Sequence, residues 1–164
     1  MFENKVLLAT RGHGLARAER DAKGNWSVAS LLADEPVRCL ASVPGNPNTV
    51  YAGTHGHGVL HSEDRGLTWQ PAGMAGQIVR ALAASPHEPG VLYAGTKPAG
   101  VFITRDGGAN WTDLEAFRHI RGWGISIVVG DEGQATAAHY ALSCPNEVRR
   151  FLRMLAESVS ERSA

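Results

Sequence analysis

The chain has 164 residues, of which 43% are apolar and 20% charged, a composition typical of an ordinary globular domain with its own core. Lysine plus arginine and aspartate plus glutamate both number 16, so the zero net charge indicates neither a nucleic-acid nor a membrane partner. The apolar run at residues 6–9 is too short for a secretory signal, and no stretch approaches a membrane span. Cys39 and Cys144 lack metal or redox spacing and are expected to be free thiols, a disulfide between them being the less favoured alternative. We therefore expect a cytoplasmic protein without a cofactor.

A repeat of 42 residues organises the sequence. Val-Arg-Cys-Leu-Ala at 37–41 returns as Val-Arg-Ala-Leu-Ala at 79–83, and Tyr-Ala-Gly-Thr at 51–54 returns at 93–96. A weaker copy lies upstream, and similarity at a fixed period indicates a repeat architecture. In chain order, the predicted organisation is a repeat domain at 1–120, made of a partial unit at 1–33 and full units at 37–75 and 79–117, followed by a divergent tail at 121–164.

Each full unit is predicted to form four short strands. Apolar runs alternate with turns rich in proline, glycine and asparagine, residues that favour tight turns. Four strands in about 40–45 residues is the size of a β-propeller blade. For the second unit the predicted elements are a buried strand at 37–43, a turn at 44–48, a strand at 49–54, a turn at 55–58, a strand at 59–62, a hairpin turn at 64–68 and a short strand from Trp69.

An aspartate, a glycine and a tryptophan recur at fixed spacing. Residues 62–69 read Ser-Glu-Asp-Arg-Gly-Leu-Thr-Trp, and residues 104–111 read Thr-Arg-Asp-Gly-Gly-Ala-Asn-Trp. The aspartate can accept backbone N–H groups within a tight turn, the glycine permits a left-handed conformation, and the tryptophan can fill space between sheets. We therefore interpret these residues as structural rather than catalytic: Asp21, Trp26, Ser62, Asp64, Gly66, Trp69, Thr104, Asp106, Gly108 and Trp111.

These segments resemble the Asp-box, S/T-x-D-x-G-x-T-W, of the BNR-repeat β-propeller superfamily, which includes sialidases, sortilin-type receptors and photosystem-assembly propellers. The segment from Asp21 to Trp26, with Lys23 in place of the glycine, is a decayed third copy. The resemblance covers roughly residues 5–117. It implies an all-β fold, a partial β-propeller of two to three four-stranded Asp-box blades, to which the residues beyond the repeat are predicted to add a C-terminal α-helical tail. It also implies that the boxes lie away from any active site.

Strand direction alternates within a blade, so the turns divide between two faces of the sheets. Propeller ligands usually occupy the face that carries the turn between the second and third strands and the blade-to-blade connection. That face leans basic and could attract an anion or an acidic protein surface, although exposed residues without a ligand are the alternative. A metal site at His55 and His57 is not expected, because no carboxylate or cysteine completes its shell. The candidate ligand residues are Arg38, His55, His57, Arg80 and Lys97.

An enzyme is the less favoured interpretation. The sialidase resemblance would require three arginines, an acidic proton donor and a tyrosine–glutamate pair, and Tyr51, Tyr93 and Tyr140 have no evident glutamate partner. Glycoside hydrolysis needs two positioned carboxylates, and no pair can be nominated. We expect a non-enzymatic binding or scaffold propeller segment, truncated from a BNR-repeat protein, that recognises a protein or an anion. A fragment of a sialidase-like glycoside hydrolase is the alternative.

The tail departs from the repeat. Residues 121–129 can form a strand, and Pro145 with apolar residues at helical spacing predicts a helix over 145–160. The change suggests a truncated or frame-shifted gene, with a capping helix as the alternative. Two to three units are too few to close a propeller, so open strand edges could support homo-oligomers.

Overall fold

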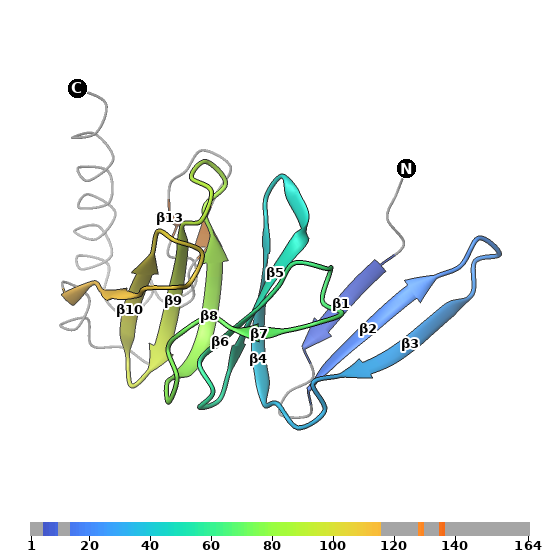
Figure 1. The fold of residues 1–164 in the computed structure, drawn as a ribbon, viewed down its shortest axis with the longest axis horizontal. Coiled ribbons are helices and arrows are strands. Elements are labelled where there is room, and N and C mark those ends of the chain that lie inside the picture. Colours follow the sequence, from blue (N-terminus) through green and yellow to red (C-terminus); the bar gives the residue numbers. More distant parts are fainter. Residues whose placement is uncertain (1–4, 10–13, 116–127, 130–134, 137–164) are drawn as a thin grey trace.

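The computed structural model describes residues 5–9, 14–115, 128–129 and 135–136, and every helix or strand assigned in them is a β-strand (Figure 1). The all-β prediction is therefore confirmed, while the helix predicted over 145–160 lies outside the described residues. The first sheet contains β1 (Lys5–Ala9), β2 (Leu15–Arg20) and β3 (Trp26–Leu31); the second contains β4 (Val37–Val43), β5 (Asn46–Thr54), β6 (Val59–Ser62) and β7 (Gln70–Pro71); the third contains β8 (Ile78–Ala84), β9 (Leu92–Lys97), β10 (Gly100–Thr104) and β11 (Thr112–Asp113).

Each sheet is an antiparallel meander in which strands that follow one another in the chain are neighbours. In the second sheet, Leu40 pairs with Ala52, and Ala52 pairs with Leu60. Because side chains alternate across a strand, these three residues share one face, and they pack with Leu32 from the preceding connection. The opposite face, which includes Tyr51, packs against the third sheet.

The repeat predicts most strand positions in the second sheet. β4 and β6 have the predicted bounds. The predicted turn at 44–48 is too long, because Asn46 already pairs with Val43. Gly45 has a φ of 76°, and this left-handed conformation lets a two-residue turn connect β4 to β5. The fourth strand starts at Gln70 rather than Trp69.

The three sheets stand side by side, with the inner strands β4 and β8 in contact (Figure 1). The main core lies between the second and third sheets and includes Val79 and Leu92, which are almost completely buried. The two sheets lie close together at Gly53, where an added Cβ would lie 2.7 Å from a Val79 methyl carbon of the third sheet and 2.5 Å from the Cys39 sulfur of its own sheet. A glycine is therefore needed at this position for the sheets to meet.

The first sheet differs from the other two. It has three strands, with β1 in contact with β4 of the second sheet. Leu15 is buried, but Trp26 is 52% exposed and Val28 is 69% exposed. The expectation that Trp26 fills space between sheets is therefore wrong for the described residues, in which it is 52% exposed and Arg20 lies over its ring, 6.0 Å from the ring centroid.

Beyond the third sheet, β12 (Val128–Val129) pairs with β13 (Ala135–Thr136), and β12 lies against β8. Part of the strand predicted over 121–129 is thus present as β12, and its remainder lies outside the described residues. Within the described ranges, no helix has the length and apolar character that crossing a membrane would require.

Candidate functional site

Asp64 holds together the hairpin turn between β6 and β7. Its carboxylate accepts the backbone N–H groups of Leu67 and Thr68 at 2.9 and 2.8 Å and the Thr68 hydroxyl at 2.6 Å. The Ser62 hydroxyl donates to the same carboxylate and accepts the Gly66 N–H, both at 2.8 Å. The hydrogen bonds from the Thr68 side chain and backbone hold the pKa of Asp64 well below its usual range. This carboxylate is therefore occupied by its own turn.

Asp106 has the same role in the third sheet. It accepts the Asn110 N–H at 2.9 Å and the Thr104 hydroxyl at 2.7 Å, and the Asn110 backbone and side chain lower its pKa to about 2. In the first sheet, Asp21 accepts the N–H groups of Lys23 and Asn25, each at 2.8 Å. We call these three segments the aspartate turns: residues 21–26, 62–69 and 104–111.

Two long-range hydrogen bonds join the second sheet to the aspartate turn of the third. The Trp111 indole N–H donates to the Ala72 carbonyl at 2.9 Å and to the Gly108 carbonyl at 3.1 Å. The Tyr51 hydroxyl donates to the Gly107 carbonyl at 3.0 Å. The Trp111–Ala72 contact joins residues that are 39 positions apart in the chain, and the Tyr51–Gly107 contact joins residues that are 56 apart. Together they set the spacing between the two sheets.

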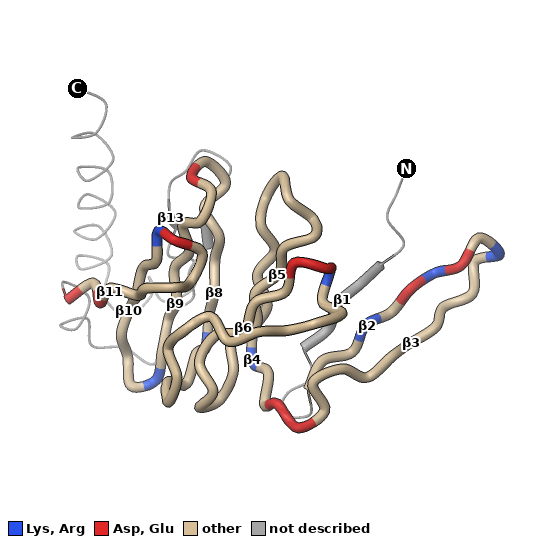
Figure 2. Tube along the Cα trace, in the orientation of Figure 1, with Lys and Arg blue, Asp and Glu red and all other residues tan. Residues whose placement is uncertain are grey.

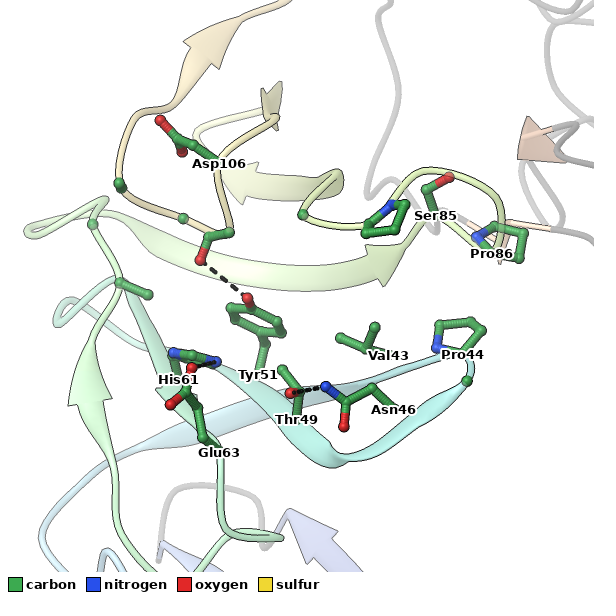
Figure 3. Close-up of a pocket in the computed structure, with 18 of the residues that line it drawn as sticks. Val43, Pro44, Asn46, Thr49, Tyr51, His61, Glu63, Ser85, Pro86 and Asp106 are labelled. Carbon is green, nitrogen blue, oxygen red and sulfur yellow. Dashed lines mark hydrogen bonds and ion pairs between the residues drawn. The ribbon is translucent and has the colours of Figure 1, made fainter.

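A groove of about 790 Å³ opens between the second and third sheets on the face that carries the aspartate turns (Figure 3). The Pro44–Gly45 turn and the Ser85–Gly90 segment form one side, and the aspartate turn at Asp106 forms another. Because these turns all line the same groove, they lie on one face of the sheets, as strand direction predicts. We call it the aspartate-turn face.

An aromatic pair lines this groove. The Tyr51 and His61 rings stack with centroids 4.6 Å apart, and Figure 3 shows Glu63 beside His61. The Glu63 carboxylate lies 3.9 Å from His61 Nε2 and is largely exposed. Burial raises the pKa of Tyr51, and the negative charge of Glu63 raises it further. Tyr51 is therefore a neutral hydroxyl that donates to the Gly107 carbonyl.

The predicted ligand residues lie at the opposite ends of the strands, on what we call the connection face. The turn after β5 is held to the connection between the second and third sheets: Gly56 N–H donates to the Gln77 carbonyl at 3.1 Å, and His55 bridges to Ile78. Figure 2 shows a basic segment where β9 turns into β10, and an acidic segment in the connection between β3 and β4 at the same end of the strands. This face is therefore mixed in charge rather than uniformly basic.

Arg38 and Arg80 occupy equivalent irregularities of two neighbouring inner strands. In β4 the pairing jumps from Val37 to Cys39, so Arg38 has no partner on β5. In β8 it jumps from Val79 to Ala81, so Arg80 has no partner on β9. A bulge re-aims the side chain of the unpaired residue. The sequence repeat thus places an arginine at the same backbone irregularity in two adjacent sheets.

The two histidines of this face have partners within it. The Arg38 Nη2 atom lies 2.5 Å from His55 Nδ1, and because arginine can only donate, His55 accepts through this nitrogen. His57 Nδ1 lies 2.5 Å from the Glu35 carboxylate. Lys97 and Arg80 are exposed. The structure therefore places Arg38 beside His55, but it places His57 beside the acidic residue Glu35.

The buried nitrogen of Arg38 is the one unusual polar atom of this face. Its Nε has no hydrogen-bond partner among the described residues, although it is shielded from solvent. Elsewhere in the described ranges, no three histidine, cysteine, aspartate or glutamate residues gather closely enough to hold a metal ion. An anion is thus the kind of ligand that could accept hydrogen bonds from the donors of this site.

The comparisons with known proteins address the fold. No protein-family model matches the chain, and a search of curated proteins finds no match. A structure of Ycf48 bound to a D1 peptide superposes with a TM-score of 0.54 at 19% identity, covering 69% of this chain and 38% of that one. An ancestral GH74 enzyme gives 0.61 at 19% identity, covering 82% of this chain and 19% of that one. The chain has a β-propeller fold.

The propeller likeness extends to a xyloglucanase from Xanthomonas campestris, another GH74 enzyme, with a TM-score of 0.55 at 23% identity over 83% of this chain and 22% of that one. The chain thus spans well under half the length of each of these three structures. At such identities the likeness shows the fold alone, and fold does not carry function across.

Sequence reasoning missed the groove of this propeller. In the sequence, Tyr51 stands out only as a candidate nucleophile without a glutamate partner. The signal was nevertheless present, because Tyr51 pairs directly with His61 across two strands whose register follows from the repeat. What the sequence lacks is the distance between blades, which is set by contacts such as Trp111 to Ala72.

Proposed function

We propose that this chain is a non-enzymatic, protein-binding propeller segment that recognises an acidic group of its partner at the connection face. Arg38 and Arg80 at equivalent bulges of adjacent inner strands carry the proposal. We further propose that the repeat is of the Asp-box (BNR) type, which the hydrogen bonding of Asp64 and Asp106 supports.

The partner's acidic group is a carboxylate. The guanidinium of Arg38 is oriented by His55 and can present its Nη N–H donors in the fork that matches a carboxylate. Arg80, one repeat later and exposed, adds a second permanent positive charge from the neighbouring strand. A protein-binding role also agrees with Ycf48, a protein of this fold that was solved with a D1 peptide bound.

Glycoside hydrolysis has less support. A general acid needs a raised pKa, but the pKa of Asp106, which lines the groove, is lowered to about 2 by its own turn. Glu63 is the other acidic residue that lines the groove, and its neighbour there is His61. The described residues that line the groove therefore offer no pair of free carboxylates for such chemistry, and the GH74 neighbours are alike in fold only.

An NMR titration with a glutamate-rich peptide tests the proposal. We expect the backbone shifts of Arg38, His55 and Arg80 to move and those of Gly66 and Gly108 to stay. The double variant Arg38→Gln/Arg80→Gln should bind at least about tenfold more weakly, since each charged hydrogen bond contributes about 1.5–3 kcal/mol. Affinity should also fall with added salt, as exposed charges are screened.

A matched control is the double variant Arg65→Gln/Arg105→Gln, which removes the same two charges from the aspartate turns. It should bind the peptide as the unmodified chain does. Equal weakening by both double variants would mean that only net charge matters. Shifts confined to Tyr51, His61 and their groove would move the binding site to the aspartate-turn face and contradict the proposal.

A further inference from the structure

The groove on the aspartate-turn face is lined by negative charge. Its lining includes Glu63 and Asp106, and no lysine or arginine is among the described residues that form it. The Asp106 pKa of about 2 keeps this carboxylate ionised at ordinary pH, although its hydrogen bonds go to its own turn. Arg65 belongs to the turn beside Glu63, but its Nε donates to the Asn48 side chain at 2.6 Å, outside the groove. Arg105 is exposed and does not line the groove either. The groove therefore favours a cation.

The acidic end of the groove combines an open carboxylate with an aromatic pair. His61 stacks on Tyr51, with the ring planes 17° apart, and the His61 side chain is 22% exposed. Glu63 lies two residues after His61, and its carboxylate is 3.9 Å from His61 Nε2, too far for a hydrogen bond. The Glu63 side chain is 82% exposed, so both of its oxygens can accept N–H groups from a ligand. A planar donor could thus meet the carboxylate and the imidazole together.

The other end of the groove is apolar and stiff. Val43 and Pro44 line it from the second sheet, and Pro86 lines it from the third. Figure 3 shows these three residues at the end away from His61 and Glu63. Proline fixes the backbone φ, so these walls are formed before a ligand arrives. The volume of about 790 Å³ is typical of ligand pockets, which measure about 300–1,000 Å³, and it leaves room for a short stretch of peptide.

We propose that this groove binds an arginine side chain in an extended segment of a protein partner. The guanidinium matches the acidic end, because it presents N–H donors to a carboxylate as a planar fork and stacks on aromatic rings. The aliphatic stem and a neighbouring apolar residue of the segment match the end formed by Val43, Pro44 and Pro86. This site takes the opposite charge from the connection face, at the opposite ends of the strands, so it does not depend on the function proposed above.

An NMR titration with the capped peptide acetyl-Gly-Leu-Arg-Leu-Gly-amide tests the proposal. The backbone shifts of His61, Glu63 and Gly107 should move. Those of Arg38 and Gly56, on the connection face, should stay. The same peptide with citrulline, which has the shape of arginine without its charge, should bind at least about tenfold more weakly, because hydrogen bonds between charged groups are the stronger ones. Lysine in place of arginine should weaken binding by a smaller factor, because it keeps the charge and loses the planar fork.

Glu63→Gln is the decisive variant, because it keeps the size of an exposed side chain and removes its charge. It should raise the dissociation constant of the arginine peptide by about tenfold or more. Glu88→Gln is the matched control, because Glu88 is exposed in the Ser85–Gly90 segment beside the groove but does not line it. This control should bind the peptide as the unmodified chain does. Melting followed by circular dichroism checks that both variants are folded.

Equal weakening by Glu63→Gln and Glu88→Gln would overturn the site, because general attraction between charges would then explain the binding. A citrulline peptide that binds as tightly as the arginine peptide would overturn it as well. So would shifts confined to the connection face, or the absence of shifts at millimolar peptide. The glutamate-rich peptide that tests the connection face should leave His61 and Glu63 unmoved, so the two sites succeed or fail separately.

Discussion

The indole hydrogen bond between sheets predicts a difference between two equivalent tryptophans. Trp111 donates to Ala72 of the second sheet and to Gly108 of its own turn, whereas Trp69 donates to Gly66 of its own turn, at 3.1 Å. Trp111→Phe and Trp69→Phe each keep an aromatic ring and lose the N–H. Both lose the bond within the turn, but only Trp111→Phe deprives the Ala72 carbonyl of its indole donor.

The size of the expected difference in unfolding free energy follows from the burial of Ala72, whose carbonyl accepts the bond. Ala72 is 8% exposed, and a buried acceptor left without a donor costs about 1–3 kcal/mol. Loss of a bond that water can replace costs about 0.5–1.5 kcal/mol. Trp111→Phe should therefore lower the free energy of unfolding by about 1–2 kcal/mol more than Trp69→Phe does, or about 2–8 °C in melting temperature for a domain of this size.

Urea denaturation followed by circular dichroism measures this difference, with equal m-values required for the comparison. The loss of ring area is the same in the two variants, so it cancels. Equal destabilisation by the two variants would show that the bond to Ala72 contributes nothing to holding the sheets together. A larger loss for Trp69→Phe would show that the sheets are held chiefly by contacts between the first and second.

Three further predictions follow from single residues. The pKa of Asp106 is lowered to about 2 from 3.8, so its stabilising effect is complete above about pH 4 and lost as pH falls toward 2; Asp106→Asn should flatten this part of the curve of melting temperature against pH. Burial raises the pKa of the Cys39 thiol to about 11, so iodoacetamide should label Cys39 far more slowly at pH 8 in the folded chain than in urea, and equal rates would contradict its burial. Gly53→Ala would place a Cβ 2.5 Å from the Cys39 sulfur and should destabilise by about 1–3 kcal/mol in denaturation, and an unchanged free energy of unfolding would contradict the close packing at this position.

The strands could be predicted because their pattern is local. The apolar run of β4 and the short run of β6 repeat at a constant offset, and a strand of this kind is read from the alternation of its own residues. The predicted turn after β4, at residues 44–48, is longer than the turn in the structure. Gly45 alone satisfies the positive φ of a two-residue turn, and the following asparagine and proline belong to the next strand.

The candidate site could be predicted only in part. Strand direction is enough to assign turns to faces, and it places the turn of Pro44 with the turn of Asp106. It does not reveal that His57 turns toward Glu35, because that contact depends on the path of a connection between sheets. The repeat also predicts, wrongly, that Trp26 is packed like Trp69 and Trp111, because a sequence repeat describes each sheet but not the residues that pack against it.

The two bonds from Tyr51 and Trp111 have a consequence for how the molecule opens. Tyr51 donates to Gly107 in the aspartate turn of the third sheet, and Trp111 of that same turn donates to Ala72 of the second sheet. This hairpin therefore cannot detach while the second sheet stays intact. The second and third sheets should therefore exchange their amide hydrogens as one cooperative unit. The first sheet contacts the second through β1 and β4 and leaves Trp26 and Val28 exposed, so it should open independently and at lower cost, with local unfolding spreading from its end of the row.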